Sequence, residues 1–334
     1  MSNSEIYIDI DELFHKYKLG NITEEPSSIS GGLLHKMFKV TTETNKYAVK
    51  WLNPSIMQRK GVMENMINSE RIAYAFSKHL PVIAALKIDN QIVLHSNQKY
   101  YMVFHWIEGT SVFPPFISEK HCYEIGSSLG KIHRLNIAIP EVKKHANESI
   151  SYNWQQYLVK GKELNVFWID TYAAMVDKLI YWNTLSNESK AKLSEFMVIS
   201  HGDLDPKNVM WHQDKPYFID WEAAGYVNPY QELIEVLNYW ANNGNGEIDK
   251  VKFNILLNAY NESMSTKTVD WDCVLNSGYA GMLGWLEYNL KRALGIESND
   301  EKEKKLGVEQ VIGTIKELER YDNQLVLLKR WLSE

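Results

Sequence analysis

Cysteine is scarce in this chain, which has only Cys122 and Cys273 among its 334 residues. Two cysteines so far apart form no disulfide framework and lack the spacing of a metal site, so we expect free thiols in a reducing cytoplasm. Apolar runs are short, and none approaches the roughly 18–20 residues that span a bilayer. The first residues lack the basic and apolar regions of a signal peptide. We therefore expect a cytoplasmic protein without a membrane partner.

Positive charge is also in the minority, because 36 Lys and Arg stand against 42 Asp and Glu and give a net charge of −6. Nucleic-acid-binding proteins replace the counterions of a phosphate backbone with clustered basic side chains. The sequence has no such basic stretch, so we expect no nucleic-acid partner. A mildly acidic surface suits a cationic small molecule, although it is also ordinary for a soluble protein.

The chain has no internal repeat and no low-complexity segment, and its length allows two lobes. Strand patterns lie before residue 108, at 37–42, 46–52, 91–95 and 100–106. A short leading helix within 6–20 precedes them, and a helix at 57–79 lies between the second and the third. Helical patterns dominate afterwards, at 118–136, at 152–196 and from 229 onward. We predict an α+β protein with an N-terminal lobe over 1–108 and a helical lobe over 109–334, with Gly109 as a hinge.

Residues 201–222 carry the most informative pattern in the sequence. Asp203 is followed by Asn208 five residues later and by Asp220 twelve residues after that. Phosphoryl transfer needs one carboxylate at the acceptor hydroxyl and further oxygen ligands for magnesium, because the protein mainly positions reactants and neutralises charge. The pattern predicts Asp203 as the catalytic base, with Asn208 and Asp220 as magnesium ligands. A loop Asp that bonds only to nearby backbone is the alternative.

This stretch resembles the catalytic loop of the aminoglycoside phosphotransferase and choline kinase family, the small-molecule relatives of protein kinases. Gly202 stands at the Arg of the protein-kinase H-R-D loop, and Asp220-Trp221-Glu222 stands at D-F-G. Both differences favour the small-molecule branch. The resemblance covers roughly residues 25–295. It implies a bilobal protein-kinase-like fold, with a small antiparallel sheet plus a helix in the N-terminal lobe, and it implies ATP and Mg2+ as cofactors.

Lys50, in the stretch Tyr47-Ala48-Val49-Lys50, resembles the strand lysine that binds the α- and β-phosphates. Glu70, in the following helix, fits the spacing for an ion pair that fixes the direction of Lys50, and Glu64 is its rival. A lysine at the end of a strand means little by itself. Its position one hairpin after a glycine pair favours the functional interpretation.

That glycine pair, Gly31 and Gly32, precedes the first full strand and allows the backbone to approach phosphates closely. A plain turn is the alternative, because the segment matches neither G-x-G-x-x-G nor a Walker A loop. The resemblance also predicts adenine contacts near Phe104 and Trp106, in the segment between the lobes. An edge strand with a buried aromatic face would explain these two residues equally simply.

Three further residues of the loop region have open roles. His201 is expected to support the loop backbone. Lys207 is expected either to contact the γ-phosphate or to remain solvated. Glu222 follows Asp220 by two residues and is a candidate for magnesium binding, for contact with a cationic substrate or for capping a helix.

The acceptor pocket is expected in the helical lobe. Aromatic and acidic side chains there can hold an ammonium group through cation–π and charge contacts, and the candidates are Asp272, Trp285, Glu287 and Tyr288. Packing in the core is the alternative for each of them. The segment 284–289 is the best single candidate for a substrate wall.

Together these patterns predict an ATP-dependent phosphotransferase that acts on a hydroxyl of a small molecule, with an aminoglycoside-type antibiotic favoured as acceptor and antibiotic resistance as the role. A choline- or ethanolamine-type acceptor, or a sugar or nucleoside, is the alternative. The non-enzyme alternative is a catalytically silent nucleotide-binding scaffold, which the presence of Asp203, Asn208 and Asp220 disfavours. A protein kinase is disfavoured by the missing H-R-D arginine and D-F-G segment. The oligomeric state is left open.

Overall fold

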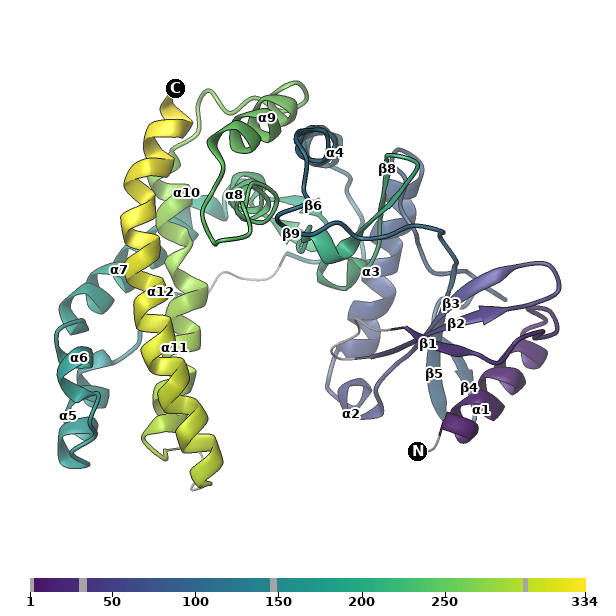
Figure 1. Ribbon diagram of the computed structural model, residues 1–334, viewed down its shortest axis with the longest axis horizontal. Coiled ribbons are helices and arrows are strands. Elements are labelled where there is room, and N and C mark those ends of the chain that lie inside the picture. The colour runs from purple at the N-terminus through teal and green to yellow at the C-terminus, as the bar shows by residue number, and fades with distance from the viewer. Residues whose placement is uncertain (1–2, 30–34, 145–148, 297–299) are drawn as a thin grey trace. The chain divides into compact units, whose positions relative to one another are not determined.

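The computed structural model describes residues 3–29, 35–144, 149–296 and 300–334 (Figure 1). The chain divides into two compact units, and each is assembled from separate stretches. The first unit comprises Met1–Lys144, Val198–Tyr226 and Tyr239–Met264. The second comprises His145–Met197, Val227–Asn238 and Ser265–Glu334. The residues predicted for catalysis, metal binding and nucleotide binding belong to the first unit, and the acceptor candidates between Asp272 and Tyr288 belong to the second.

The first unit contains a five-stranded antiparallel sheet in the order β1-β2-β3-β5-β4. Its strands are β1 (Ser27–Ile29), β2 (Lys36–Thr41), β3 (Lys46–Trp51), β4 (Leu94–Ser96) and β5 (Lys99–His105). β3 lies at the centre, where Lys50 pairs with Met37 of β2 and with Met102 of β5. The four strands predicted before residue 108 are confirmed to within three residues at each end.

The two faces of this sheet bury different clusters, because successive side chains of a strand point to opposite faces. On one face Tyr47, Val49 and Trp51 pack with apolar residues of helix α1 (Asn3–Lys16). On the other face Met102 packs with Met66 of helix α3 (Val62–Ser77). Lys50 lies between Val49 and Trp51 in sequence, so its side chain points to the α3 face.

The helix predicted at 57–79 is divided in the structure. A short helix α2 (Pro54–Met57) begins after Asn53, whose side chain accepts a hydrogen bond from the Ser55 N–H. Helix α3 begins after Gly61, whose φ of 84° lies in the left-handed region that glycine adopts without strain. The apolar periodicity of the sequence continues across this break, but the left-handed conformation of Gly61 interrupts the helix.

A compact group of short elements follows residue 197. It contains β6 (Val198–Ser200), the 3-10 turns η1 (Pro206–Asn208) and η2 (Trp221–Ala223), and the strands β7 (Val209–His212), β8 (Lys215–Phe218) and β9 (Gly225–Val227). β7 and β8 form a hairpin whose two-residue turn, Gln213-Asp214, has positive φ at both positions. Such a turn matches the twist of the strands that it joins.

Helices α4 (Glu119–Leu135) and α9 (Lys250–Asn261) pack closely in the first unit. Gly126 and Gly130 lie one turn apart on α4, and an added Cβ at either would meet the backbone of α9 at Leu256 or Tyr260. These glycines allow two helix backbones to approach more closely than ordinary side chains permit.

The second unit is helical. The helical region predicted at 152–196 consists of three helices, α5 (Trp154–Glu163), α6 (Ile169–Ala173) and α7 (Val176–Leu193). The helices that follow in this unit are α8 (Pro229–Trp240), α10 (Trp271–Ser277), α11 (Tyr279–Ala293) and α12 (Glu301–Ser333). Asp322 of α12 accepts hydrogen bonds from Trp182 Nε1 of α7 (3.2 Å) and from the Tyr279 hydroxyl of α11 (2.5 Å). The Trp182 and Tyr279 rings stack 5.1 Å apart.

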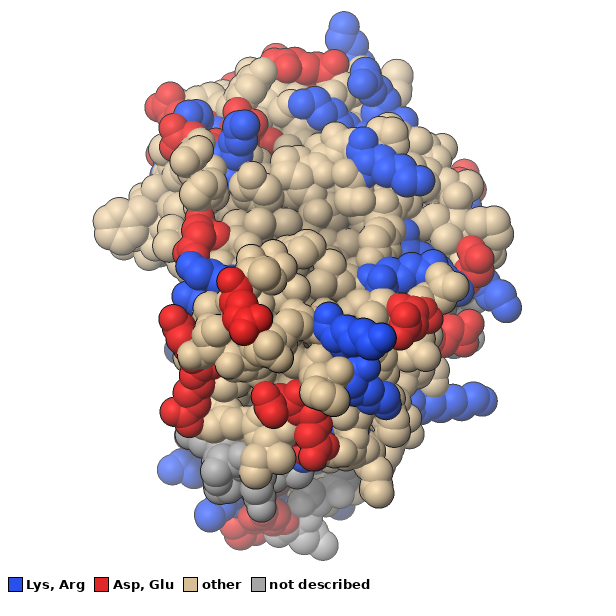
Figure 2. Space-filling view, turned by 90° about the vertical axis from the view of Figure 1, so that its right-hand side faces the viewer, with Lys and Arg blue, Asp and Glu red and all other residues tan. Residues whose placement is uncertain are grey.

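The predicted boundary near residue 108 has first-unit residues on both sides, and the division into lobes at that point stays a prediction. Figure 2 shows a face on which Lys and Arg side chains are interspersed with Asp and Glu. Within the described ranges, no helix combines the length and the apolar character that crossing a bilayer requires.

Candidate active site

His201 holds the backbone of the loop that carries Asp203. It is fully buried, its Nδ1 accepts the Asp203 N–H (3.3 Å), and its Nε2 lies 3.0 Å from the Ile219 carbonyl oxygen. The ring therefore carries its proton on Nε2 and connects the loop to the end of the β7–β8 hairpin.

Gly202 explains why this loop lacks the arginine of protein kinases. Its φ is 76°, and an added Cβ would lie 2.4 Å from the Ala223 carbonyl oxygen. A side chain would collide with the backbone of η2, which no rotamer change can relieve. The glycine at this position thus allows the Asp203 loop and the Asp220 turn to touch.

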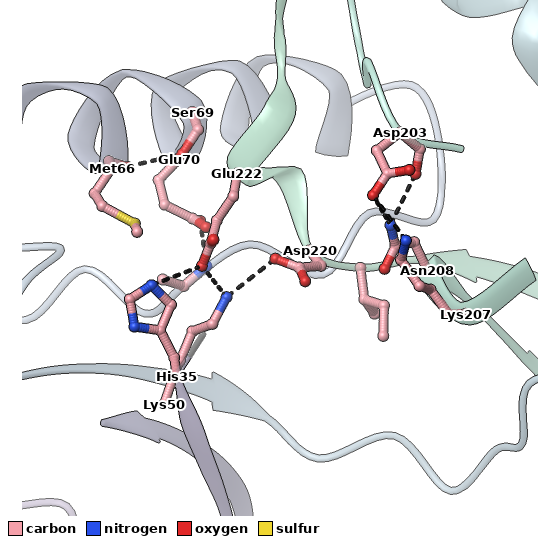
Figure 3. Close-up of polar contacts among 12 residues, drawn as sticks. His35, Lys50, Met66, Ser69, Glu70, Asp203, Lys207, Asn208, Asp220 and Glu222 are labelled. Atoms are coloured by element: carbon pink, nitrogen blue, oxygen red, sulfur yellow. Dashed lines mark hydrogen bonds and ion pairs between the residues drawn. The ribbon is translucent and has the colours of Figure 1, made fainter. Parts of the chain in front are cut away.

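Asp203 lies beside Asn208, as Figure 3 shows. The Asn208 Nδ2 group donates to the Asp203 carbonyl (2.8 Å) and to its Oδ2 (3.0 Å). Lys207 Nζ lies 3.2 Å from the same Oδ2. Partial burial would lower the pKa of Lys207, but its hydrogen bond and charge contacts with Asp203 and Asp205 raise it. The Asp203 side chain remains 34% exposed, so a substrate hydroxyl can reach it.

The hairpin brings Asp220 to Asn208 by its register. Val209 pairs with Phe218, and the next residues outward are joined by a 3.0 Å bond from the Ile219 N–H to the Asn208 carbonyl. Asp220 follows with a φ of 57°. Trp221, which is buried, stacks on Phe76 of α3 with ring centroids 5.4 Å apart. The sequence spacing of twelve residues thus becomes proximity in space.

The donor set suits magnesium. Asn208 uses its amide nitrogen on Asp203, which leaves its oxygen for another partner, and the Asp220 carboxylate is 44% exposed. Amide and carboxylate oxygens are the hard ligands that magnesium prefers, completed by water and phosphate oxygens. Among the described residues no cluster of three or more His, Cys, Asp or Glu has the arrangement of an all-protein metal cage. The assignment of Asn208 and Asp220 as magnesium ligands stays a prediction.

Lys50 has different partners from the one expected. Its Nζ lies 3.0 Å from Asp220 Oδ1 and also binds Glu222 Oε1 (Figure 3). In the part of the chain that the structure describes, no ion pair joins Lys50 to Glu70. Burial by itself would lower the pKa of the Lys50 ammonium, but the charges of Asp220 and Glu222 outweigh burial and raise it.

Glu70 instead accepts a hydrogen bond from the Ala85 N–H (2.6 Å). The predicted Lys50–Glu70 pair is therefore wrong for this structure, because the η2 turn brings two carboxylates closer to Lys50 than α3 does. Burial raises the pKa of Glu70 to about 7, while the bond from Ala85 and the charge of Lys50 oppose this rise.

The raised pKa of Glu70 makes stability depend on pH. Between about pH 4.5 and pH 7 the folded protein keeps a proton on Glu70 that the unfolded chain releases. Stability should thus fall as pH rises through this window, by up to about 3 kcal/mol. Glu70→Gln, which keeps an acceptor for Ala85, should flatten this slope in urea unfolding measured at pH 5, 6 and 7. An equally steep slope in the variant would assign the pH dependence to other groups.

The remaining nucleotide candidates are placed as follows. Gly31 and Gly32 lie outside the described residues. Phe104 is partly buried and packs against the cluster on the α3 face. Trp106 follows the end of β5, and its backbone N–H donates to the Lys46 carbonyl (3.1 Å). The adenine contacts assigned to Phe104 and Trp106 stay predictions.

The aromatic acceptor candidates are exposed on helix α11 rather than packed in the core. Trp285 and Tyr288 are 46% and 43% exposed, and their rings stack 5.6 Å apart. Trp285 Nε1 donates to Gln310 Oε1 (3.2 Å), and the Arg292 guanidinium lies 5.4 Å from the centre of the Tyr288 ring. The accessible aromatic surface thus already has a cation on one of its rings.

The acidic acceptor candidates already have partners. Glu287 accepts a hydrogen bond from the Tyr157 hydroxyl (2.6 Å) and pairs with Lys291 at 2.8 Å. Asp272 pairs with Lys329 at 2.6 Å. These four candidates belong to the second unit, and their contact with an acceptor stays a prediction.

We predicted no role for His35 from the sequence. It is 4% exposed, its Nδ1 accepts the Asn53 N–H (2.9 Å), and its Nε2 lies 3.7 Å from Glu222 Oε1. His35 lies three residues after Gly32 in the sequence, and a single histidine is more often structural than functional.

Comparisons with known proteins agree with this geometry. The sequence model of the phosphotransferase enzyme family, APH, matches residues 26–263. Protein LicA homolog of Mycoplasma capricolum subsp. capricolum (strain California kid) is 25% identical over 158 residues, which cover 47% of this chain. The chain spans 58% of the length of that curated relative.

Two solved structures share the fold. A spectinomycin phosphotransferase in complex with ADP and spectinomycin aligns with a TM-score of 0.62 at 15% identity, over 91% of this chain and 97% of that one. Choline kinase LicA from Streptococcus pneumoniae aligns with a TM-score of 0.58 at 15% identity, over 95% of this chain and 100% of that one. The predicted protein-kinase-like α+β fold is confirmed. Because the family model covers more than half of the sequence, the chain belongs to the phosphotransferase enzyme family.

Proposed function

We propose that this protein transfers the γ-phosphoryl group of ATP to a hydroxyl group of a small molecule in a magnesium-dependent reaction. One observation carries the proposal. A continuous series of contacts joins Asp203 to Asn208, the Asn208 backbone to Ile219 beside Asp220, and Asp220 to Lys50. Residues far apart in the sequence thus lie together, and their side chains are the groups that such a transfer needs.

Each of these residues has one role in the proposal. Asp203 orients the acceptor hydroxyl and receives its proton, since its carboxylate is 34% exposed and is held by the Asn208 amide. Asn208 and Asp220 hold magnesium, which supplies positive charge to the phosphates when bound. Lys50 binds the α- and β-phosphates, and its raised pKa keeps it charged at neutral pH. Lys207 lies close enough to Asp203 to add positive charge near the transferred group.

The acceptor that we propose is a cationic molecule with a free hydroxyl, of the aminoglycoside antibiotic type. The fold shared with a spectinomycin phosphotransferase supports this choice. A choline- or ethanolamine-type acceptor is the second candidate. The similarity to the LicA homolog in sequence and to a choline kinase in fold favours it. The exposed Trp285–Tyr288 pair offers aromatic surface to either kind of cation.

The test is magnesium-dependent release of ADP from ATP, measured with a panel of aminoglycosides, spectinomycin, choline, ethanolamine, sugars and nucleosides. We expect one class of amino alcohol to stimulate ADP release at least tenfold above the rate with water alone. Mass spectrometry of the product would then show the added phosphate and its position. If only a sugar or nucleoside stimulated ADP release, the proposed cationic acceptor would be wrong, but the proposed kinase activity would stand.

Two controls separate the enzyme from a nucleotide-binding scaffold. Asp220→Asn should abolish the stimulated rate, because it removes a carboxylate that holds magnesium in the proposal. Omission of magnesium should do the same, because the metal supplies the positive charge that balances the phosphates. A protein that binds ATP but shows no stimulated turnover with any member of the panel, and whose residual ATP hydrolysis is unchanged in Asp203→Asn, would be the silent scaffold instead.

A further inference from the structure

The ammonium group of Lys50 is enclosed by acidic side chains that come from the η2 turn. Lys50 is buried, and its Nζ contacts both Asp220 and Glu222. An ammonium group has three N–H donors, so two are engaged and one is left for a phosphate oxygen. When Asp220 serves as a metal ligand, Glu222 is the remaining carboxylate that can fix the direction of Lys50.

Glu222 itself is approached by a buried donor. His35 Nδ1 accepts the Asn53 N–H, so the ring proton lies on Nε2. That Nε2 is fully buried and has no hydrogen-bond partner among the described residues, yet it lies 3.7 Å from Glu222 Oε1. A buried donor without a partner costs free energy, so its orientation toward this carboxylate requires an explanation.

We propose that Glu222, supported by His35, is the residue that positions Lys50 for the nucleotide phosphates. This is the role that the family pattern suggested for Glu70, which the structure places on the Ala85 N–H instead. The proposal rests on the proposed function, because it assumes that Lys50 binds phosphate. His35 and Glu222 are positioning residues, since they act through Lys50 and Figure 3 shows them grouped around its ammonium.

A rival role for Glu222 is direct binding of magnesium, and the two roles differ in a measurable way. A metal ligand matters only when metal is present. A residue that positions Lys50 matters for phosphate binding even without metal. Binding of ADP in the presence of EDTA therefore separates the two.

The experiment measures the Kd of fluorescently labelled ADP in EDTA and then in excess magnesium for the wild type, Glu222→Gln, His35→Leu and the double variant. We expect Glu222→Gln to raise Kd about tenfold in EDTA, the weight of one hydrogen bond to a charged group. His35→Leu should raise it less, and the double variant should be no worse than Glu222→Gln. His35→Gln, which retains a donor, should restore part of the affinity. Glu24→Gln, an exposed carboxylate of the same unit, is the control.

Several outcomes would overturn the proposal. An unchanged Kd in EDTA together with a higher magnesium requirement would make Glu222 a metal ligand. Tighter binding in Glu222→Gln would mean that Glu222 competes with phosphate for Lys50. Fully additive effects of the two substitutions on Kd would mean that His35 does not act through Glu222. If His35→Leu does not fold, the partly exposed Glu222 still tests the proposal. Failure of the wild type to bind ADP would instead reject the proposed function.

Discussion

Asp203→Asn is expected to lower kcat by about 10²–10⁴-fold, the usual contribution of a positioned acid–base group. The substitution keeps the size of the side chain and a hydrogen-bonding partner for Asn208, but it removes the charge that we propose to orient the acceptor hydroxyl and to receive its proton. The KM for ATP should change little, because the proposal assigns the phosphates to other residues. Steady-state ADP release with the acceptor found in the panel measures both values.

The matched control is Asp214→Asn, the same chemical change within the β7–β8 hairpin. Asp214 is exposed in the turn, where its positive φ suits Asn equally well, and it pairs with Lys120 on the surface. Its kcat should stay within about twofold of the wild type. Near-normal turnover in Asp203→Asn would remove Asp203 from the chemistry, whereas equal losses in both variants would indicate damage to the hairpin.

Gly126→Ala is expected to destabilise the protein by about 3 kcal/mol, at the upper end of the usual cost of overpacking. The new Cβ would lie 2.2 Å from the Leu256 carbonyl oxygen, and backbone cannot move aside as a flexible side chain can. Helix α4 would have to separate from α9. The better helix propensity of alanine offsets only about 1 kcal/mol of this cost. Urea unfolding monitored by circular dichroism measures the change.

Gly313→Ala provides the comparison for that substitution. Gly313 also lies inside a helix, but no atom of the described residues comes within 4 Å of its Cβ position. Alanine there should stabilise α12 by roughly 0.5–1 kcal/mol, because it restricts the unfolded chain and favours the helix. If Gly126→Ala behaved like Gly313→Ala, the close packing of α4 on α9 would be incorrect.

The sequence located the catalytic loop because local spacing encodes it. Asn208 and Asp220 flank two short apolar strands with a polar turn between them, and a hairpin is the simplest way to connect such strands. The strands of the sheet were equally predictable, since the alternation of their side chains reflects burial on two different faces. Helix boundaries were less predictable, because α3 begins only after Gly61, whose backbone is left-handed, while the apolar pattern of the sequence starts before it.

The partners of Lys50 could not be read from the sequence. The choice between Glu70 and Glu222 depends on how far α3 and the η2 turn lie from the sheet, which is a matter of tertiary packing. The stacking of Trp221 on Phe76 and the close approach of Gly202 to Ala223 determine that geometry. Likewise, the hydrogen bond from Tyr157 of α5 to Glu287 of α11 joins different helices, and no spacing predicts it, whereas the Glu287–Lys291 pair is an i,i+4 contact within α11.

The register of the β7–β8 hairpin has a consequence for recognising distant relatives. Pairing at the open end of the hairpin places Asn208 opposite Ile219, next to Asp220, so the number of residues in its closed end does not affect this placement. Two residues added symmetrically to the strands would lengthen the interval and preserve the alignment, whereas one residue inserted into a single strand would shift it and turn one ligand away. Search patterns for such enzymes should therefore fix the pairing and let the interval vary.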